Sequence, residues 1–290
     1  MIPLSYAQQR LWFLSRLDHS PAYNVPIAID LRGAVDRAAL RGAFTDVVGR
    51  HEALRTVFPV HDGMPHQCIV ENAEPVWLES DCPATGVDAF VAEASRYIFD
   101  LTVELPVRAT LLRSGPDQHL LLVVMHHIVS DGWSMSPLLR DIAAAYRART
   151  AGAAPAWEPL PVQYADYTAW QQELLGDPGD PDTIAHRQLK YWTKALDALP
   201  EEATLAPDHP RPAMPSYRGQ VVTLQFDMDN CAALLELARR EQVTLFMVLQ
   251  AALAGTLSRL GAGHDIVFGS PVAGRVDEAL EDLVGFFVNT

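Results

Sequence analysis

The hydrophobic residues of the chain recur with two periods, one typical of strands and one typical of helices. A half-buried strand is predicted where apolar residues occupy every second position, at Val25, Ile27, Ile29 and Leu31. A fully buried strand is predicted over 120–125, where leucines, valines and a methionine follow one another without a break.

Helices are predicted where apolar residues lie three or four positions apart. Ser5 and Gln8 form a capping box that opens a helix running to about Leu17. Asp36 can cap a second helix, whose expected buried residues are Leu40, Ala43, Phe44 and Val47. A third helix begins at Ser136-Pro137, and its expected buried residues are Leu139, Ile142, Ala143 and Tyr146.

The second half of the chain continues the mixture of helices and strands. The patterns predict a helix over 183–199, strands over 221–226 and 266–269, and two helices within 230–260, ended by Gly261. The stretches 148–161 and 176–182 are rich in Ala, Pro, Gly or Asp and are typical of surface connections. The order predicts an α/β fold with a break near residue 175.

The composition is that of a globular protein in a reducing compartment. Hydrophobic residues make up 49% and charged residues 20% of the 290 residues, which suffices for two compact units. A net charge of −14 disfavours nucleic acid as a partner, because phosphate binding needs a basic surface. No apolar run is long enough for a membrane span, and three widely spaced cysteines argue against a disulfide framework or a zinc site. We therefore expect a cytoplasmic protein.

Residues 125–134, MHHIVSDGWS, carry the most informative chemistry. Two adjacent histidines end the buried strand, and Asp131 and Gly132 follow in a predicted loop, where catalytic side chains are commonly held. On a strand-like backbone His126 and His127 point to opposite faces, so only one of them can face a given cavity.

Three interpretations of these histidines are open. A metal site is disfavoured, because adjacent histidines on opposite faces chelate poorly and no HExxH spacing is present. The histidines can also simply close a core strand through hydrogen bonds. The third interpretation is acyl transfer, in which a histidine serves an attacking nucleophile. The absence of GxSxG and of a reactive-cysteine context argues against a covalent acyl-enzyme.

Motifs along the whole chain resemble, in order, those of condensation domains in nonribosomal peptide synthetases. His126, His127, Asp131 and Gly132 match the HHxxxDG motif of that family. The other matches are SYAQQRLWFL (5–14), RHEALRTVF (50–58), YADYTAWQ (164–171), GSPVAGR (269–275) and VGFFVNT (284–290). HHxxxDG alone also occurs in related acyltransferases, so the order of the motifs carries the resemblance.

The resemblance implies an α/β fold of two chloramphenicol-acetyltransferase-like lobes that meet in a V. The first lobe would span 1–175 and include the HHxxxDG loop, and the second, incomplete, would span 176–290. Donor and acceptor carrier domains would dock at the two ends of a tunnel that passes His127. Substrates would be carried on the phosphopantetheine arms of those carriers, the domain itself would bind no cofactor and no metal, and an adenylation domain would adjoin it in the full synthetase.

The resemblance also implies roles for single residues. His127 would be catalytic, whereas His126, Asp131 and Gly132 would shape its motif, with Asp131 paired to Arg55. The predicted tunnel residues are Trp133, Ser134, Gly274 and Arg275. From the sequence alone Arg275 can line the tunnel mouth, pair with an acid, or lie on a surface turn. His51 and the other isolated histidines receive no role. The surroundings of the histidines look most like the subtype that joins an L-configured donor to an L-configured acceptor.

Two further functions stay open. A stand-alone acyltransferase that uses coenzyme A shares the HHxxxDG chemistry, although the flanking motifs favour the synthetase family. A non-catalytic recruitment module of the same fold is the other. Such modules tend to lose the catalytic histidine, which is present here as His127.

The family's domain continues beyond VGFFVNT, so we expect a truncated domain that is inactive alone. Residues 1–175 are expected to fold by themselves. The apolar residues Phe286, Phe287 and Val288 are expected to form an exposed end that is prone to self-association.

Overall fold

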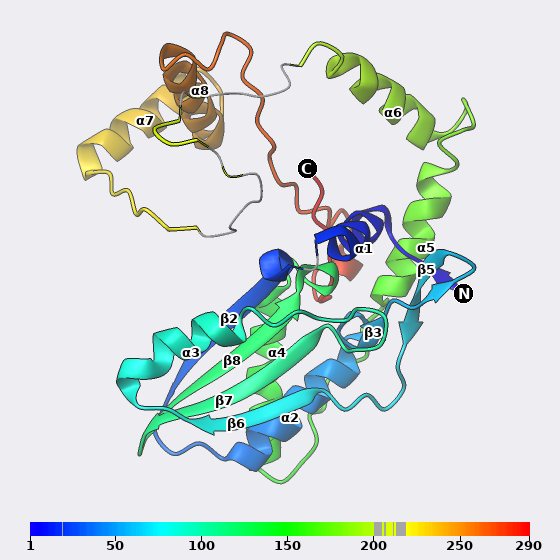
Figure 1. The fold of residues 1–290 in the computed structure, drawn as a ribbon, viewed down its shortest axis with the longest axis vertical. Coiled ribbons are helices and arrows are strands. Elements are labelled where there is room, and N and C mark those ends of the chain that lie inside the picture. Colours follow the sequence, from blue (N-terminus) through cyan, green and yellow to red (C-terminus); the bar gives the residue numbers. More distant parts are fainter. Residues whose placement is uncertain (19, 200–204, 206, 211, 213–218) are drawn as a thin grey trace. The chain divides into compact units, whose positions relative to one another are not determined.

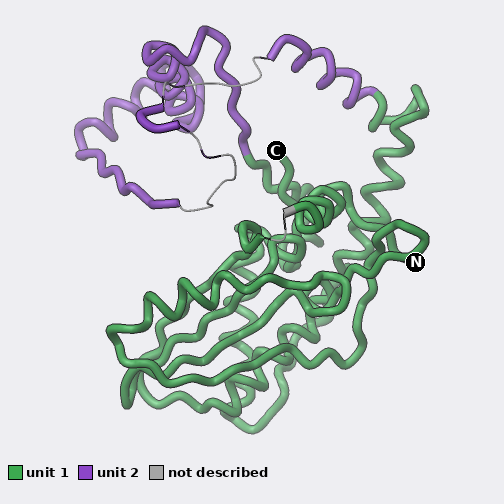
Figure 2. Tube along the Cα trace, viewed as in Figure 1, with its two compact units in different colours: residues 1–186, 271–290 green, residues 187–270 purple. Residues whose placement is uncertain are grey.

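The computed structural model describes residues 1–18, 20–199, 205, 207–210, 212 and 219–290, and divides into two compact units. Figure 2 colours unit 1, residues 1–186 with 271–290, separately from unit 2, residues 187–270. The last segment of the chain therefore folds with its beginning. The division into lobes over 1–175 and 176–290 stays a prediction.

Unit 1 mixes helices and strands, which confirms the α/β class. Its strands are β1 (Ile2–Pro3), β2 (Asn24–Arg32), β3 (Thr56–Val57), β4 (Val60–His61), β5 (Met64–Ile69), β6 (Val76–Asp81), β7 (Val107–Gly115) and β8 (Gln118–His126). Its α-helices are α1 (Tyr6–Asp18), α2 (Arg37–Arg50), α3 (Val87–Ala94), α4 (Met135–Thr150) and α5 (Tyr164–Leu175). Its short 3-10 helices are η1 (Pro21–Tyr23), η2 (Glu52–Arg55), η3 (Ala84–Gly86), η4 (His127–Val129) and η5 (Glu278–Leu280).

The main sheet of unit 1 has the strand order β2-β8-β7-β6 (Figure 1). β8 pairs antiparallel with both β2 and β7, and β6 pairs parallel with β7. The predicted strand 120–125 lies within β8 and is buried on both faces, as an inner strand should be. The alternating strand is confirmed as β2, an edge strand whose odd-numbered residues from Val25 to Leu31 are partly buried. Because β8 ends at His126, the two histidines follow directly from an inner strand that is paired on both sides.

Helices α2 and α4 pack together against one face of this sheet. The prediction for α2 is confirmed, because Asp36 accepts a hydrogen bond from Ala39 N and the predicted apolar residues are buried. The predicted face of α4 was partly wrong. Leu138 and Ala145 are buried with Ile142, whereas Leu139 is 38% exposed. The helical periodicity of α4 leaves two adjacent rows of side chains about equally apolar. Packing against α2 decides which of the two rows is buried.

Helix α1 begins with the predicted capping box. Ser5 N donates to Gln8 Oε1 at 3.1 Å, and Gln8 N donates to Ser5 Oγ at 3.1 Å. Both side chains are buried. Beside this helix start, β1 pairs with β5 in a second, small sheet that also contains β3 and β4.

Helix α6 (Ile184–Ala195) runs from unit 1 into unit 2, whose other helices are α7 (Met228–Arg240) and α8 (Leu245–Arg259). The predicted helices within 230–260 are therefore confirmed, and Gly261 follows α8 with a φ of +94°. The predicted strands at 221–226 and 266–269 are wrong, since neither segment is assigned as a strand or pairs with another described segment. A strand needs a partner for its backbone ladder, and periodicity alone does not supply one. Among the described helices, none has the length and apolar character that a membrane crossing requires.

The end of the chain is not exposed as expected. Phe286 and Phe287 are each 2% exposed and belong to the hydrophobic core of unit 1, and Val288 is partly buried against it. The backbone of Val272 pairs with that of Asn289, which holds the two ends of the segment 271–290 together. The prediction of an exposed apolar end was therefore wrong, and self-association of the chain stays a prediction.

Candidate active site around His127

His126 ends β8 and is a structural residue of the loop that follows. Its ring is buried, and its Nδ1 accepts a hydrogen bond from Ile128 N at 3.1 Å, which caps the short helix η4. The rings of Tyr23 and Phe99 flank it, with centroids 6.3 and 6.4 Å away. Burial, helped by the neighbouring His127, lowers the pKa of His126 to about 4. The ring is therefore neutral at neutral pH.

His127 is only partly buried and has one ring nitrogen engaged. Its Nδ1 lies 2.6 Å from the carbonyl oxygen of Ser130. A carbonyl oxygen can only accept, so Nδ1 carries the proton and Nε2 of the neutral ring carries a lone pair. Within the described part of the chain, Nε2 has no hydrogen-bond partner. The arrangement leaves a fixed, unoccupied proton acceptor at this loop.

Asp131 is buried and anchors the loop through both carboxylate oxygens. Oδ1 accepts from Ser134 N at 2.9 Å, and Oδ2 accepts from Phe287 N at 3.0 Å. The guanidinium of Arg275 lies 3.3 Å from Oδ1, and both side chains of this ion pair are at most 6% exposed. Of the alternatives left open for Arg275, the structure selects pairing with an acid.

The predicted pair of Asp131 with Arg55 is therefore wrong. Arg55 ends η2, and its guanidinium donates to the carbonyl oxygen of Val70 at 3.0 Å and pairs with Glu52 at 3.3 Å. These local partners hold Arg55 on its own segment, whereas Arg275 is delivered to Asp131 by the final segment of unit 1.

Arg275 also fixes the turn that precedes the last motif. Its Nη1 donates to the carbonyl oxygens of Leu280 and Leu283, and its guanidinium lies over the ring of Phe287, 4.2 Å from the centroid. Its Nη2 donates to Ser134 Oγ at 3.0 Å. Arg275 thus joins the HHxxxDG loop to the segment 280–287.

The backbone of residues 284–287 is held by side chains rather than by a neighbouring strand. Val284 N donates to His51 Nδ1 at 3.3 Å, and Gly285 N donates to Ser134 Oγ at 3.1 Å. Asp131 Oδ2 accepts a hydrogen bond from Phe287 N, as described above. Three buried polar side chains, one from the RHEALRTVF motif and two from the HHxxxDG loop, therefore bind three backbone amides of this segment.

Tyr164 completes the set from the fourth motif. Its hydroxyl donates to the carbonyl oxygen of Phe286 at 2.6 Å and lies 2.9 Å from Ser5 Oγ. Burial raises the pKa of Tyr164, so the hydroxyl keeps its proton and remains a donor. Gly285 packs against the Tyr164 ring so closely that an added Cβ would lie 2.3 Å from it.

These contacts place Phe286 against His127. The two rings meet edge to face, with centroids 5.0 Å apart and an interplanar angle of 66°. Together with the Ser130 carbonyl, Phe286 fixes the orientation of the imidazole.

The remaining predicted residues lie around this cluster. Ser134 is buried within it, whereas Gly132 is exposed and Trp133 is 47% exposed. Gly274 has a φ of +69°, and an added Cβ would lie 2.1 Å from the carbonyl oxygen of Phe287, so this position requires glycine. The role of Trp133, Ser134, Gly274 and Arg275 as tunnel residues stays a prediction.

Four residues of the site were not predicted as site residues: His51, Asp141, Tyr164 and Phe286. His51, which received no role, is 1% exposed and bonded to both Val284 and Asp141. Asp141 lies on the buried side of α4, where the apolar pattern gave no reason to expect an acid. The position of His51 inside the RHEALRTVF motif was the available signal. No three His, Cys, Asp or Glu side chains of the described residues gather as a metal ligand set.

Comparisons with known proteins agree with these motifs. The family model described as "Condensation domain" matches residues 1–290. The chain is 55% identical over 290 residues to the "Probable non-canonical nonribosomal peptide synthetase (NRPS) CymA" of Salinispora arenicola, covering 100% of this chain and 4% of that protein. It is 49% identical over 292 residues to the "Dimodular nonribosomal peptide synthase" of Bacillus subtilis, covering 100% and 12%.

Among solved structures, the X-domain in the "Complex of the X-domain and OxyB from Teicoplanin Biosynthesis" is similar, with a TM-score of 0.92 and 38% identity. That match covers 99% of this chain and 63% of the other. "Holo-AB3403 a four domain nonribosomal peptide synthetase bound to AMP and Glycine" matches with a TM-score of 0.84 and 26% identity, covering 99% and 22%. The chain thus spans less than two thirds of the length of each of these proteins.

Proposed function

The chain belongs to the condensation-domain family of nonribosomal peptide synthetases, and from this membership we propose that it forms amide bonds between carrier-bound substrates. His127 is the proposed catalytic residue. The observation that carries the proposal is its ring geometry, in which the Ser130 carbonyl holds the proton on Nδ1 and leaves Nε2 free. Nε2 is then the atom that meets the attacking amine.

The proposed reaction is attack by the α-amine of an acceptor aminoacyl thioester on the carbonyl carbon of a donor acyl thioester. The new C–N bond forms first, giving a tetrahedral intermediate, and the C–S bond of the donor breaks as this intermediate collapses. The proton leaving the amine passes to His127 Nε2, and from there to the departing thiolate. The imidazolium that forms in between still donates a hydrogen bond from its Nδ1 to the Ser130 carbonyl oxygen.

Positioning is the larger part of the proposed effect. An α-amine has a pKa of roughly 7.7–8.0, so about a tenth of it is already neutral at pH 7. Prior deprotonation can therefore contribute only about one decade of rate, whereas orientation of reactants can contribute roughly 7–11 kcal/mol. We accordingly assign His127 to orienting the amine and accepting its proton as the tetrahedral intermediate forms.

The substrates and partners follow from the family. Condensation domains of these synthetases act on substrates held by carrier domains, consistent with phosphopantetheine arms. We propose donor and acceptor carrier domains as the partners, an adjoining adenylation domain, and the subtype that joins an L-configured donor to an L-configured acceptor. Trp133 and Gly274 are proposed to line the path of the arms.

The test is replacement of His127 in a synthetase that contains this chain, with both carrier domains loaded. His127→Ala should lower amide formation by about 10²–10⁴-fold, the usual contribution of a positioned acid or base. Its thermal unfolding should match the wild type, because the ring makes one hydrogen bond to a loop carbonyl. Undiminished product formation by a folded His127→Ala protein would remove His127 from the reaction.

A recruitment module is the second candidate, favoured by the similarity to the X-domain from teicoplanin biosynthesis. The two functions separate in the same assay. A wild-type protein that binds a partner of the assembly line but joins no loaded substrates would identify the recruitment module. Amide formation from a soluble coenzyme A thioester, without a donor carrier, would instead identify a stand-alone acyltransferase.

A further inference from the structure

A buried histidine outside the HHxxxDG motif is bonded at both ring nitrogens. His51 lies between α2 and η2 and is 1% exposed. Its Nδ1 accepts from Val284 N at 3.3 Å, and its Nε2 lies 3.1 Å from Asp141 Oδ2. Because Nδ1 accepts, the proton of the neutral ring is on Nε2, which donates to the carboxylate.

Asp141 connects this histidine to two arginines. Arg50 Nε donates to Oδ2 at 2.9 Å, and Arg140 Nε donates to Oδ1 at 3.2 Å. Arg140 Nη1 also pairs with Asp282 at 2.7 Å. Asp141 therefore reaches the last segment twice, through His51 to Val284 and through Arg140 to Asp282.

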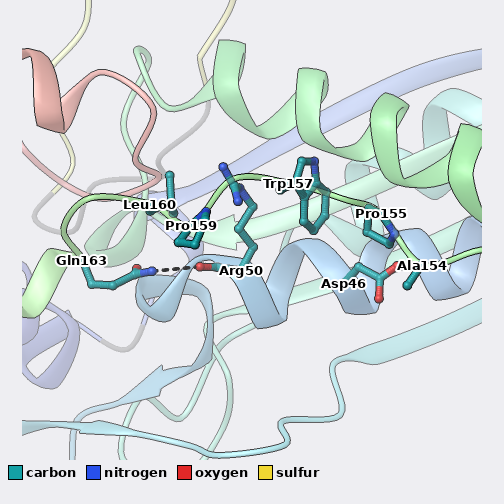
Figure 3. Close-up of a pocket in the computed structure, with 8 residues that line it drawn as sticks. All are labelled: Asp46, Arg50, Ala154, Pro155, Trp157, Pro159, Leu160 and Gln163. Atoms are coloured by element: carbon teal, nitrogen blue, oxygen red, sulfur yellow. Dashed lines mark hydrogen bonds between the residues drawn. The ribbon is translucent and has the colours of Figure 1, made fainter.

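The other end of this network is fixed on the connection before α5. Arg50 Nη1 donates to the carbonyl oxygen of Glu158 at 2.8 Å, and its guanidinium lies 5.0 Å from the centroid of the Trp157 ring. Figure 3 shows Arg50 between Pro159 and Trp157 in a pocket of about 420 Å³, with its main-chain oxygen bonded to Gln163. Arg50 thus has little freedom to follow a movement of Asp141.

Val284 is two residues before Phe286, the ring that packs on His127. The bonds to Ser134, Tyr164 and Asp131 hold residues 285–287. Within the described part of the chain, His51 makes the only side-chain hydrogen bond to the backbone of Val284. Loss of the His51 bond would leave a buried amide without a partner, an unfavourable state that a shift of the segment would relieve. A shift at residue 284 changes where the Phe286 ring lies.

We propose that His51 is a positioning residue for the reaction: it holds Val284 and thereby keeps Phe286 against the His127 imidazole. The inference rests on the proposed function of His127, and it adds the buried pair of His51 and Asp141 to the groups on which catalysis depends.

The same geometry makes the hydrogen bond between Val284 N and His51 Nδ1 dependent on pH. Protonation of His51 at Nδ1 would turn the acceptor into a donor that faces the Val284 N–H. Burial lowers the pKa of His51, the neighbouring Asp141 opposes this shift, and Arg50 and Arg140 add to it. The lowered pKa keeps the bond intact at neutral pH, and the contact is lost only as the pH falls through that lowered value.

The test compares His51→Leu, which can make neither bond, with His51→Gln, whose amide can accept from Val284 N and donate to Asp141. Nuclear Overhauser contacts between the His127 and Phe286 rings are measured by NMR in the full 290-residue chain. We expect His51→Leu to lose these contacts and His51→Gln to keep them. His119→Leu is the matched control, because His119 is also buried but lies on β8 away from Val284.

Activity supplies the second measurement. In the synthetase, His51→Leu should lower kcat by about 10–100-fold, the scale of a small misplacement, with KM for the carriers unchanged. His51→Gln should restore kcat. Contacts and kcat that stay at wild-type values in His51→Leu would overturn the proposal.

If the His51→Leu protein does not fold, a third measurement on the wild type and His51→Gln still tests the proposal. In the wild type, the contacts between the two rings should weaken as the His51 ring becomes protonated, and in His51→Gln they should persist to the same pH. Persistence in the wild type after His51 has titrated would overturn the proposal. The NMR contacts do not depend on catalysis, so a wild-type chain that forms no amide would count against the proposed function alone.

Discussion

Two neighbouring histidines use the same ring nitrogen in opposite ways. His126 Nδ1 accepts from Ile128 N, so its proton is on Nε2, whereas His127 Nδ1 donates to the Ser130 carbonyl and leaves Nε2 free. The difference arises because the strand ends between them and the loop presents an amide to one ring and a carbonyl to the other. A histidine with a capping role and the proposed catalytic histidine are therefore adjacent in the chain.

The lowered pKa of His126 predicts a loss of stability in acid. Its pKa falls from 6.5 in the unfolded chain to about 4 in the folded one, so the unfolded state binds more protons in this interval. The contribution is fully present above pH 6.5 and disappears as the pH falls to about 4. It amounts to up to about 3 kcal/mol. Urea unfolding at a series of pH values should show this loss in the wild type.

His126→Asn provides the control for this prediction. The asparagine oxygen can accept the Ile128 N–H but does not titrate, and His51 titrates in both proteins and cancels in the comparison. The unfolding free energy of His126→Asn should therefore fall less between pH 6.5 and about 4 than that of the wild type. Parallel curves for the two proteins would contradict a buried neutral His126.

At the scale of elements, the HHxxxDG loop and the segment 280–287 depend on each other for their hydrogen bonds. Among the residues that the structure describes, no strand pairs with the loop after β8 or with residues 284–287. Each satisfies the polar groups of the other through Asp131, Ser134 and Arg275. Such a mutual arrangement is stable only when both parts are in place.

A double-mutant cycle on Asp131→Asn and Arg275→Met tests this mutual dependence. Removing one partner of a buried ion pair costs about 3–5 kcal/mol, because the other charge stays buried. The two changes together should cost less than their sum, with a coupling energy of about 0.5–3 kcal/mol in denaturant unfolding.

Arg55→Met is the matched control for the cycle. Arg55 pairs with Glu52 and not with Asp131, so Arg55→Met and Asp131→Asn should be additive. Coupling with Arg55 and additivity with Arg275 would reverse the assignment of the partner of Asp131.

At the scale of the whole molecule, the core of unit 1 is completed from the far end of the chain. Five residues of the last segment are buried in it: Leu280, Leu283, Val284, Phe286 and Phe287. Burial of such side chains contributes about 1.5–3 kcal/mol each. Their sum approaches the stability of a whole domain, about 5–15 kcal/mol.

Truncation tests this long-range contribution. A chain of residues 1–175, which the sequence alone led us to expect to fold, should lack a cooperative unfolding transition, and so should a chain of residues 1–270. The full chain should unfold cooperatively, as followed by circular dichroism during heating. A 1–175 fragment that melts at the temperature of the full chain would show that the last segment adds little to the core.

The sequence by itself determined the elements whose residues lie close together in the chain. The alternation over Val25–Leu31, the apolar run of β8 and the capping box at Ser5 were readable because they depend on local backbone geometry. The strands β6 and β7 gave no such signal, since Glu79, Arg108 and Arg113 interrupt their apolar patterns. The motifs indicated the family and His127 for a related reason, because each is a short contiguous string.

Only the tertiary structure decided which distant side chains meet. Several arginines were available to Asp131, and the partner is Arg275, 144 positions away, because the last segment folds back onto the HHxxxDG loop. The same return of the chain buries Phe286 and Phe287, brings Val284 to His51, and replaces a neighbouring strand with polar side chains. Local periodicity reports which face of an element is buried, but not which other element covers it, and that choice sets the chemistry around His127.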